Sequence, residues 1–185
     1  MKDTLISRRE FLKDIGMIGA GVLLSASPWL SAFSEVVETS GEKCRLAIIG
    51  PGSRGRFLMS FLVQNPKVEI VALCDIYKPS IEKALELAPK AKVYDDYREI
   101  LEDKTVDAVL VATPLNSHCQ IVLDAFDAGK HVFCEKSIGF TMEECFRIYN
   151  KHISTEKVFF TGQQRLFDPR YIKAMEMIHA GTFGE

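Results

Sequence analysis

The sequence is poor in the residue patterns that build metal sites and disulfide frameworks. It has four histidines and five cysteines in 185 residues. No two cysteines stand at C-x-x-C spacing and no histidine lies at metal-ligand spacing from a cysteine pair, so we expect no metal site. An odd number of cysteines leaves at least one unpaired within the chain, and all five are predicted to be structural thiols. They are Cys44, Cys74, Cys119, Cys134 and Cys145.

An excess of charge of one sign is also missing. The chain has 23 Lys and Arg against 25 Asp and Glu, which gives a net charge of −2. This balance excludes a strongly basic nucleic-acid-binding protein, and we expect no nucleic-acid partner. Hydrophobic residues make up 47% and charged residues 26%, which is the composition of a globular protein and not of a disordered one.

The apolar run at residues 15–24 is too short and too rich in glycine to span a bilayer stably. It follows Ser-Arg-Arg-Glu-Phe-Leu-Lys at residues 7–13, which is the twin-arginine export pattern. We therefore predict a twin-arginine signal peptide at 1–34 and a polar linker at 35–42, with the mature protein in the periplasm or outside the cell. A cytoplasmic amphipathic helix is the alternative, and the cleavage site stays open. Because this route moves folded proteins, it favours a tightly held cofactor.

From residue 43 onward, short apolar runs alternate with helical patterns. The runs predict six strands, at 43–49, 68–74, 92–94, 107–112, 130–134 and 157–161. Uninterrupted apolar strands between helices favour a parallel sheet covered on both faces. Since crossovers are right-handed, we expect an α/β fold of the Rossmann type over 43–168, doubly wound, with six strands and helices on both faces. A helix over 169–179 follows, within a segment 169–185.

A G-x-G-x-x-G pattern at residues 50–55 follows the first predicted strand and precedes a helix. Gly50 permits a tight turn, Gly52 lets the backbone approach a pyrophosphate, and Gly55 lets the helix pack on the strand. The helix N-terminus that follows offers N–H groups and a positive dipole end to phosphates. The pattern alone also occurs in ordinary tight turns. Its place in the first strand–helix unit favours a dinucleotide site that includes Ser53 and Arg54.

Asp75 ends the second predicted strand, where a carboxylate can accept hydrogen bonds from the adenine-ribose hydroxyls. It would repel a 2′-phosphate, which favours NAD over NADP, although it could instead cap a loop. Arg54 complicates this preference, because a guanidinium in the glycine loop could contact a phosphate or stack on adenine.

Two further strand ends carry polar residues, Thr113 and Pro114 with His118 after the fourth strand, and Glu135 with Lys136 after the fifth. Ligands bind beyond the carboxyl ends of the strands in such sheets, so these residues should line the same crevice as the glycine loop. His118 would cap or line this crevice or lie at the surface. A lysine beside a glutamate there can act as an acid, or as a donor to a substrate oxygen.

The segments 112–118, 128–136 and 164–171 together resemble the Gfo/Idh/MocA family of NAD(P)-dependent sugar oxidoreductases. The resemblance implies that Lys136 lies near the nicotinamide and the substrate hydroxyl, and that Thr113, Pro114 and Glu135 contact the nicotinamide side of the cofactor. Ser137 stands where the family pattern has proline, which puts the rigidity of the Lys136 turn in question.

The family also has a second domain that carries substrate residues, and the resemblance implies that residues 169–185 lead to such a domain, missing from this chain. The full-length protein is expected to be a homo-oligomer. Arg165 either reaches the substrate or pairs on the surface.

Two hypotheses of function follow, from different classes. The first is an exported NAD(P)-dependent oxidoreductase acting on a sugar or cyclitol, with Lys136 as its catalytic residue. A variant is a glycosidase that works by transient oxidation and elimination, since the twin-arginine pattern and Gly-x-x-Arg-Gly loop resemble those of exported NAD-dependent α-N-acetylgalactosaminidases. The second hypothesis is a non-catalytic nucleotide-binding module. A methyltransferase would leave the Thr113-Pro114 and Glu135-Lys136 segments unexplained.

Overall fold

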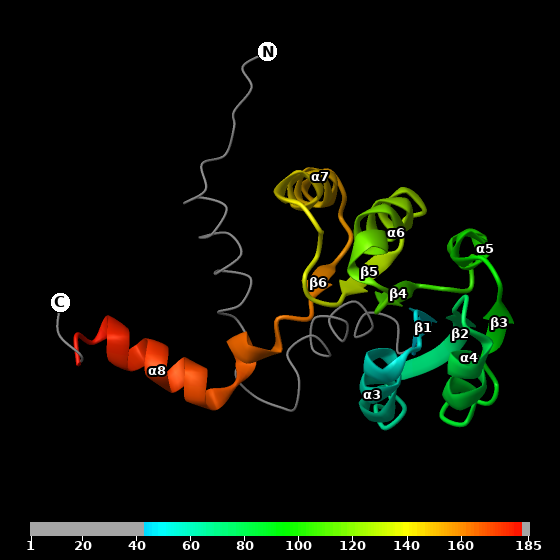
Figure 1. The fold of residues 1–185 in the computed structure, drawn as a ribbon, viewed down its shortest axis with the longest axis horizontal. Helices are drawn as coiled ribbons and strands as arrows, with labels where there is room; N and C mark the ends of the chain where they lie inside the picture. The colour runs from blue at the N-terminus through cyan, green and yellow to red at the C-terminus, as the bar shows by residue number, and fades with distance from the viewer. Residues whose placement is uncertain (1–42, 183–185) are drawn as a thin grey trace, which may run out of the picture. The chain divides into compact units, whose positions relative to one another are not determined.

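The structure is a computed structural model that describes residues 43–182 (Figure 1). The chain divides between Gln163 and Gln164 into two compact units, and each is considered by itself below. This division comes five residues earlier than the predicted end of the Rossmann domain at residue 168. The predicted signal peptide and linker lie outside the described residues and stay predictions.

The first unit is built on a six-stranded sheet in which every pairing is parallel. The strand order is β3-β2-β1-β4-β5-β6, so the predicted Rossmann-type fold is confirmed. The strands are β1 (Cys44–Ile49), β2 (Val68–Cys74), β3 (Lys92–Tyr94), β4 (Ala108–Val111), β5 (His131–Cys134) and β6 (Phe159–Thr161). The order reverses between β1 and β4, and ligands bind at such a switch point in open α/β sheets.

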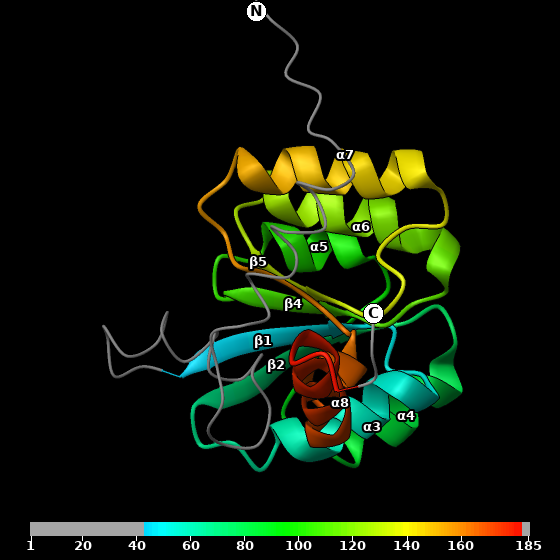
Figure 2. The same ribbon diagram turned by 90° about the vertical axis from the view of Figure 1, so that its left-hand side faces the viewer.

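Helices cover both faces of this sheet (Figures 1 and 2). On one face lie α3 (Ser53–Leu62) and α4 (Lys78–Leu85), and on the other lie α5 (Tyr97–Glu102), α6 (Leu115–Asp127) and α7 (Met142–Ile153). The helix α3 begins at Ser53, so the second half of the glycine loop already belongs to its first turn. The helix α7 begins with a capping box, in which the side chains of Thr141 and Glu144 each accept a hydrogen bond from the other residue's backbone N–H.

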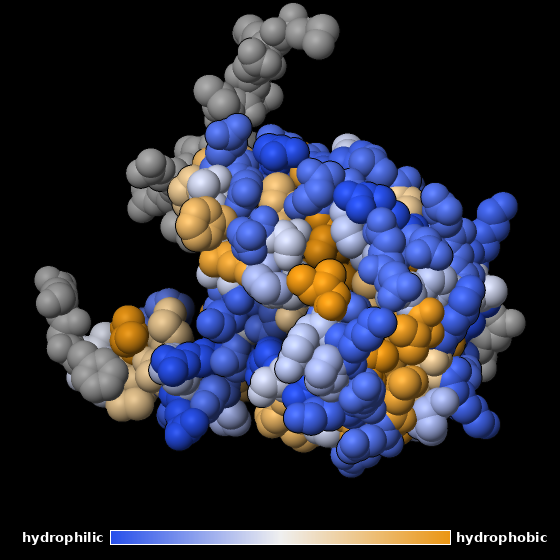
Figure 3. Space-filling view, turned by 45° about the vertical axis from the view of Figure 1, so that its right-hand side comes forward, coloured by the Kyte–Doolittle hydropathy of each residue, from blue (hydrophilic) through white to orange (hydrophobic). Residues whose placement is uncertain are grey.

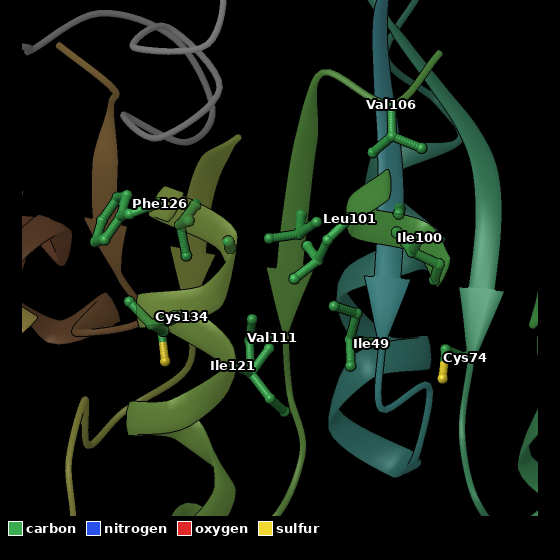
Figure 4. Close-up of a cluster of buried hydrophobic side chains, with 14 of the residues drawn as sticks. Ile49, Cys74, Ile100, Leu101, Val106, Val111, Ile121, Phe126 and Cys134 are labelled. Atoms are coloured by element: carbon green, nitrogen blue, oxygen red, sulfur yellow. The ribbon is translucent and has the colours of Figure 1, made fainter. Parts of the chain in front are cut away.

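The core explains why the strands read as uninterrupted apolar runs. All four residues of β4 are buried, because helices cover the sheet on both sides. Figure 4 shows side chains of the cluster, among them Ile49, Val111 and Cys134 from the strands and Ile121 and Phe126 from α6. Burial on this scale is the main favourable term in folding, and the parallel pairing places the carboxyl ends of the strands at one edge.

The cysteines are part of this packing, and all five are free thiols. Burial is the largest cause that raises the pKa of the Cys44 thiol to about 11, and it raises the pKa of the Cys134 thiol as well. A thiol with a raised pKa is a poor nucleophile and a poor metal ligand. These surroundings agree with the prediction that the cysteines are structural thiols.

The second unit contains a 3₁₀ helix, η1 (Gln164–Phe167), and the helix α8 (Pro169–His179). The Asp168 side chain accepts the N–H of Arg170 at 2.9 Å and so caps α8. Proline at the first turn and Gly181 after the last one, with a φ of +69°, match the predicted bounds of this helix. Among the described residues, no helix is both long and apolar enough to cross a bilayer.

Candidate functional site

The glycine loop joins β1 to α3 at the carboxyl edge of the sheet. Gly50 has a φ of +84°, and a Cβ there would lie 2.7 Å from the Thr113 amide nitrogen. A Cβ on Gly55 would lie 2.5 Å from the Gly50 carbonyl oxygen. Both positions therefore exclude a side chain on packing grounds, and the loop after β4 presses directly on the glycine loop.

Gly52 is different, because a Cβ there would meet nothing within 4 Å. It is the N-cap of α3, with no side-chain cap and no acidic residue in the first turn. Ser53, the first residue of the helix, is exposed. An uncapped N-terminus presents N–H groups and the positive end of the helix dipole, which is the donor set that suits a pyrophosphate.

Carboxylates gather where β2 and β3 end. Asp75 accepts the N–H of Tyr77 through Oδ1 at 2.9 Å, so it caps its loop with one of its two carboxylate oxygens. The pKa of the Cys74 thiol is raised to about 11, first by burial and then by four carboxylates. In decreasing order of effect these belong to Asp96, Asp75, Asp95 and Glu99. The negative charge at this corner opposes a further phosphate group.

His118 joins the loops that follow β4 and β5. Its ring is almost fully buried, with Nδ1 2.8 Å from the Ser137 carbonyl oxygen and Nε2 2.8 Å from the Thr113 carbonyl oxygen. Both ring nitrogens are engaged by the backbone, which favours a part in shaping this edge over direct contact with a cofactor. Thr113 also accepts the hydroxyl of Ser117 at 2.8 Å, and Pro114 is exposed at the N-terminus of α6.

Glu135 follows β5 and is buried, with 5% of its surface exposed. Its Oε1 accepts a hydrogen bond from Arg54 Nε at 2.7 Å, and its Oε2 accepts the backbone N–H of Lys136 at 3.0 Å. The Lys136 side chain is exposed. The glutamate therefore pairs with the arginine of the glycine loop, and contacts its neighbouring lysine through the backbone.

Gly162, just after β6, is a residue that the sequence reasoning missed. A Cβ there would lie 2.8 Å from the carboxyl carbon of Glu135, so this glycine leaves room for the buried carboxylate. A glycine at the end of a strand can indicate a close approach of another group. The sequence does not show that this group is Glu135, which follows the neighbouring strand β5.

Arg165 belongs to the second unit. Its guanidinium donates to the Tyr171 hydroxyl at 3.1 Å and lies over the Tyr171 ring, with 5.8 Å to the centroid. Contact between Arg165 and the substrate stays a prediction.

Figure 3 shows one face of the molecule, on which hydrophilic residues predominate and apolar residues gather in separate patches. Within residues 43–182 no group of three or more His, Cys, Asp or Glu side chains is placed to hold a metal ion.

The fold and this edge define a dinucleotide-binding oxidoreductase domain. A family model described as an oxidoreductase family with an NAD-binding Rossmann fold matches residues 44–163. The chain therefore belongs to the Gfo/Idh/MocA oxidoreductase family, as the sequence resemblance predicted.

Individual relatives fall into two groups. The chain is 32% identical over 97% of its length to a glycosyl hydrolase family 109 protein of Stenotrophomonas maltophilia, and 29% identical over 97% to an alpha-N-acetylgalactosaminidase of Shewanella oneidensis. Among solved structures, it is similar to the myo-inositol dehydrogenase of Lactobacillus casei in complex with NAD(H) and myo-inositol. That similarity has a TM-score of 0.71 at 32% identity, over 77% of this chain. The chain spans 40%, 44% and 43% of these three proteins.

Proposed function

We propose that the protein is an NAD-dependent oxidoreductase that moves a hydride between nicotinamide and a hydroxyl-bearing carbon of a sugar or cyclitol. The observation that carries the proposal is the joining of the glycine loop to the Lys136 turn by the Arg54–Glu135 ion pair, at one edge of the sheet. A dinucleotide lying along this edge would place its phosphates and its reactive ring at opposite ends of that link.

The residues at this edge fit a dinucleotide. The uncapped N-terminus of α3 and the open space at Gly52 suit the pyrophosphate. Asp75 can accept the ribose hydroxyls, and the surrounding carboxylates favour NAD over NADP. Bound there, the cofactor supplies a hydride acceptor and donor. Thr113 and Glu135 border the site on the nicotinamide side.

Lys136 is proposed as the catalytic residue. Its ammonium is exposed at the carboxyl edge of the sheet, and among residues 43–182 it forms no ion pair with Glu135. A cation in this position can donate a hydrogen bond to the reacting oxygen of the substrate and hold a proton there. The carbohydrate would be the small-molecule partner, and the full-length protein would act as a homo-oligomer.

A second candidate is an NAD-dependent glycosidase, favoured by the similarity to the glycosyl hydrolase family 109 protein and the alpha-N-acetylgalactosaminidase over 97% of the chain. Oxidation at one sugar carbon would acidify the neighbouring C–H bond, so that the aglycone can leave as an alcohol by elimination. Water would then add to the resulting double bond before the hydride returns to the ketone. Release of a deglycosylated sugar without net NADH would support this candidate, whereas stoichiometric NADH would support the dehydrogenase.

The twin-arginine pattern at residues 7–13 supports export of the folded protein, with its cofactor, to the periplasm or beyond. Replacing both Arg8 and Arg9 with Lys should retain the protein in the cytoplasm, as measured by cell fractionation. Retention of the unchanged protein in the cytoplasm would contradict export without touching the proposed chemistry.

Native mass spectrometry of the purified protein tests the proposal directly. We expect NAD to co-purify, or to bind when added, and Lys136→Ala to keep the dinucleotide while losing turnover of a sugar or cyclitol. A protein that binds no dinucleotide would overturn the proposal. Dinucleotide binding with turnover unaffected by Lys136→Ala would remove the lysine from catalysis, and binding without any turnover by the full-length protein would indicate a non-catalytic module.

A further inference from the structure

The Glu135 carboxylate uses its two oxygens in two directions. Oε1 accepts from Arg54 Nε at 2.7 Å, and Oε2 accepts from the Lys136 backbone N–H at 3.0 Å. Hydrogen bonds to a charged acceptor are stronger than those between neutral groups. One buried side chain thus connects the start of α3 to the turn that carries the proposed catalytic residue.

This carboxylate depends on Arg54 for its charge balance. Burying a carboxylate without a charge partner is strongly unfavourable. Among residues 43–182, Arg54 is the cation that forms an ion pair with Glu135. Without it, the carboxylate would turn toward water, and the bond to the Lys136 amide would weaken.

Neighbouring packing keeps the carboxylate in place. Gly162 lies close enough that a Cβ would come within 2.8 Å of one carboxylate oxygen and 2.9 Å of the other. Its N–H donates to the Cys134 carbonyl oxygen at 2.8 Å, so the glycine cannot move away without breaking the β5–β6 pairing. On the other side, the Arg54 guanidinium lies over the Phe57 ring, 5.3 Å from its centroid.

We propose that Arg54 is a positioning residue that sets the place of Lys136 through Glu135. It acts on the lysine backbone and touches neither the substrate nor the reacting ring. This inference rests on the proposed function, which makes Lys136 the catalytic residue. The sequence suggested that Arg54 contacts a phosphate or stacks on adenine. The proposal instead assigns its side chain to the Lys136 turn.

Three variants of the full chain test the proposal by NMR in the presence of saturating NADH. Arg54→Gln removes the charge, Arg54→Lys keeps it on a shorter side chain, and Gly162→Ala displaces the carboxylate while leaving the arginine intact. The readouts are the exchange rate of the Lys136 amide proton and the nuclear Overhauser contact between the Lys136 side chain and the nicotinamide protons. Arg45→Gln is the matched control, because it removes another arginine–carboxylate pair among the described residues, to Asp107 at 2.7 Å, at the amino ends of β1 and β4.

In the unchanged protein we expect a protected Lys136 amide and a contact with the nicotinamide. Arg54→Gln and Gly162→Ala should each speed amide exchange by about tenfold, the equivalent of one charged hydrogen bond, and should lose the nicotinamide contact while NADH stays bound. Arg54→Lys should restore part of both signals. Arg45→Gln should change neither signal, even though it lowers stability.

The two possible failures are distinguishable. If the unchanged protein binds no NADH, or its Lys136 shows no contact with the nicotinamide, the proposed function is wrong. If both are present in the unchanged protein and persist in Arg54→Gln, Arg54 is not a positioning residue. If Arg54→Gln does not fold, Gly162→Ala and Arg54→Lys decide the question by the same two signals.

Discussion

The Nδ1 atom of His118 lies 2.8 Å from the carbonyl oxygen of Ser137. Ser137 stands where the family pattern has proline, so the Lys136 turn lacks the rigidity of a proline ring at that position. The imidazole restrains the Lys136 turn through this contact, and its Nε2 atom lies 2.8 Å from the Thr113 carbonyl oxygen of the neighbouring loop. Two loops that both border the proposed nicotinamide site are thereby held by one buried side chain.

Replacing this histidine should destabilise the protein. We expect His118→Phe to lower the free energy of unfolding by about 1–3 kcal/mol, because a buried backbone carbonyl loses the imidazole N–H that donates to it. Urea denaturation measures the change. His179→Ala, at an exposed position of α8, is the control and should stay within about 0.5 kcal/mol. Equal stability of the two variants would mean that the His118 bonds contribute nothing net.

Two glycines of the same loop should respond oppositely to alanine. Gly52 has a φ of −64°, and a Cβ there meets nothing within 4 Å. Gly52→Ala should therefore fold normally but lower the affinity for NAD about tenfold or more, since the methyl group enters the space needed by the pyrophosphate. Isothermal titration with NAD and urea denaturation separate the two effects.

Gly55→Ala should have its main effect on folding, because its Cβ would lie 2.5 Å from the Gly50 carbonyl oxygen. Overpacking of this kind costs about 1–3 kcal/mol. If Gly52→Ala binds NAD as tightly as the unchanged protein, the pyrophosphate does not lie against Gly52, and the proposed binding mode is wrong.

Stability should fall as the pH drops below about 6.5. The pKa of His131 is lowered, first by burial and then by the charge of Lys157, and burial also lowers the pKa of His152. His131 Nδ1 accepts the backbone N–H of Val158 at 3.0 Å, so protonation would break a bond next to β6. The unfolded chain takes up these protons at a higher pH than the folded one, and acid therefore favours unfolding.

Thermal midpoints between pH 7.5 and pH 5 measure this dependence. In His131→Leu the slope should be reduced, because one of the two titrating groups is gone. A slope as steep as that of the unchanged protein would assign the pH dependence to other groups.

The strand pattern and the glycine loop could be predicted because their causes are local. A buried strand between helices must be apolar along its whole length, as β4 is, and Gly50 needs its positive φ whatever surrounds it. The ends of parallel strands share one edge, so the approximate grouping of Asp75, Thr113 and Glu135 also followed from the sequence.

The partners within that edge could not be predicted in the same way. Arg54 and Glu135 are 81 residues apart, and they meet because the parallel strands β1 and β5 end at the same edge of the sheet, one strand apart. The sequence suggested that Glu135 would act on the ammonium of its neighbour Lys136, since adjacent residues are assumed to interact. Both residues follow β5, where the Glu135 carboxylate bonds Arg54 and lies beside Gly162, while the Lys136 side chain is exposed.

Asp75 should set the preference between the two dinucleotides. Asp75→Asn keeps an oxygen that can accept the Tyr77 N–H but removes one charge from the corner where β2 and β3 end. A carboxylate facing a phosphate at close range costs about 1 kcal/mol or more, so the ratio of the Kd for NADP to the Kd for NAD should fall about fivefold or more. Fluorescence titration with NADH and NADPH measures the ratio. Asp127→Asn, which removes the ion pair with Lys151 at the other end of α6, is the control and should leave it unchanged. An unchanged ratio in Asp75→Asn would move the discrimination to the neighbouring carboxylates Asp95 and Asp96, whose charges also reach Cys74.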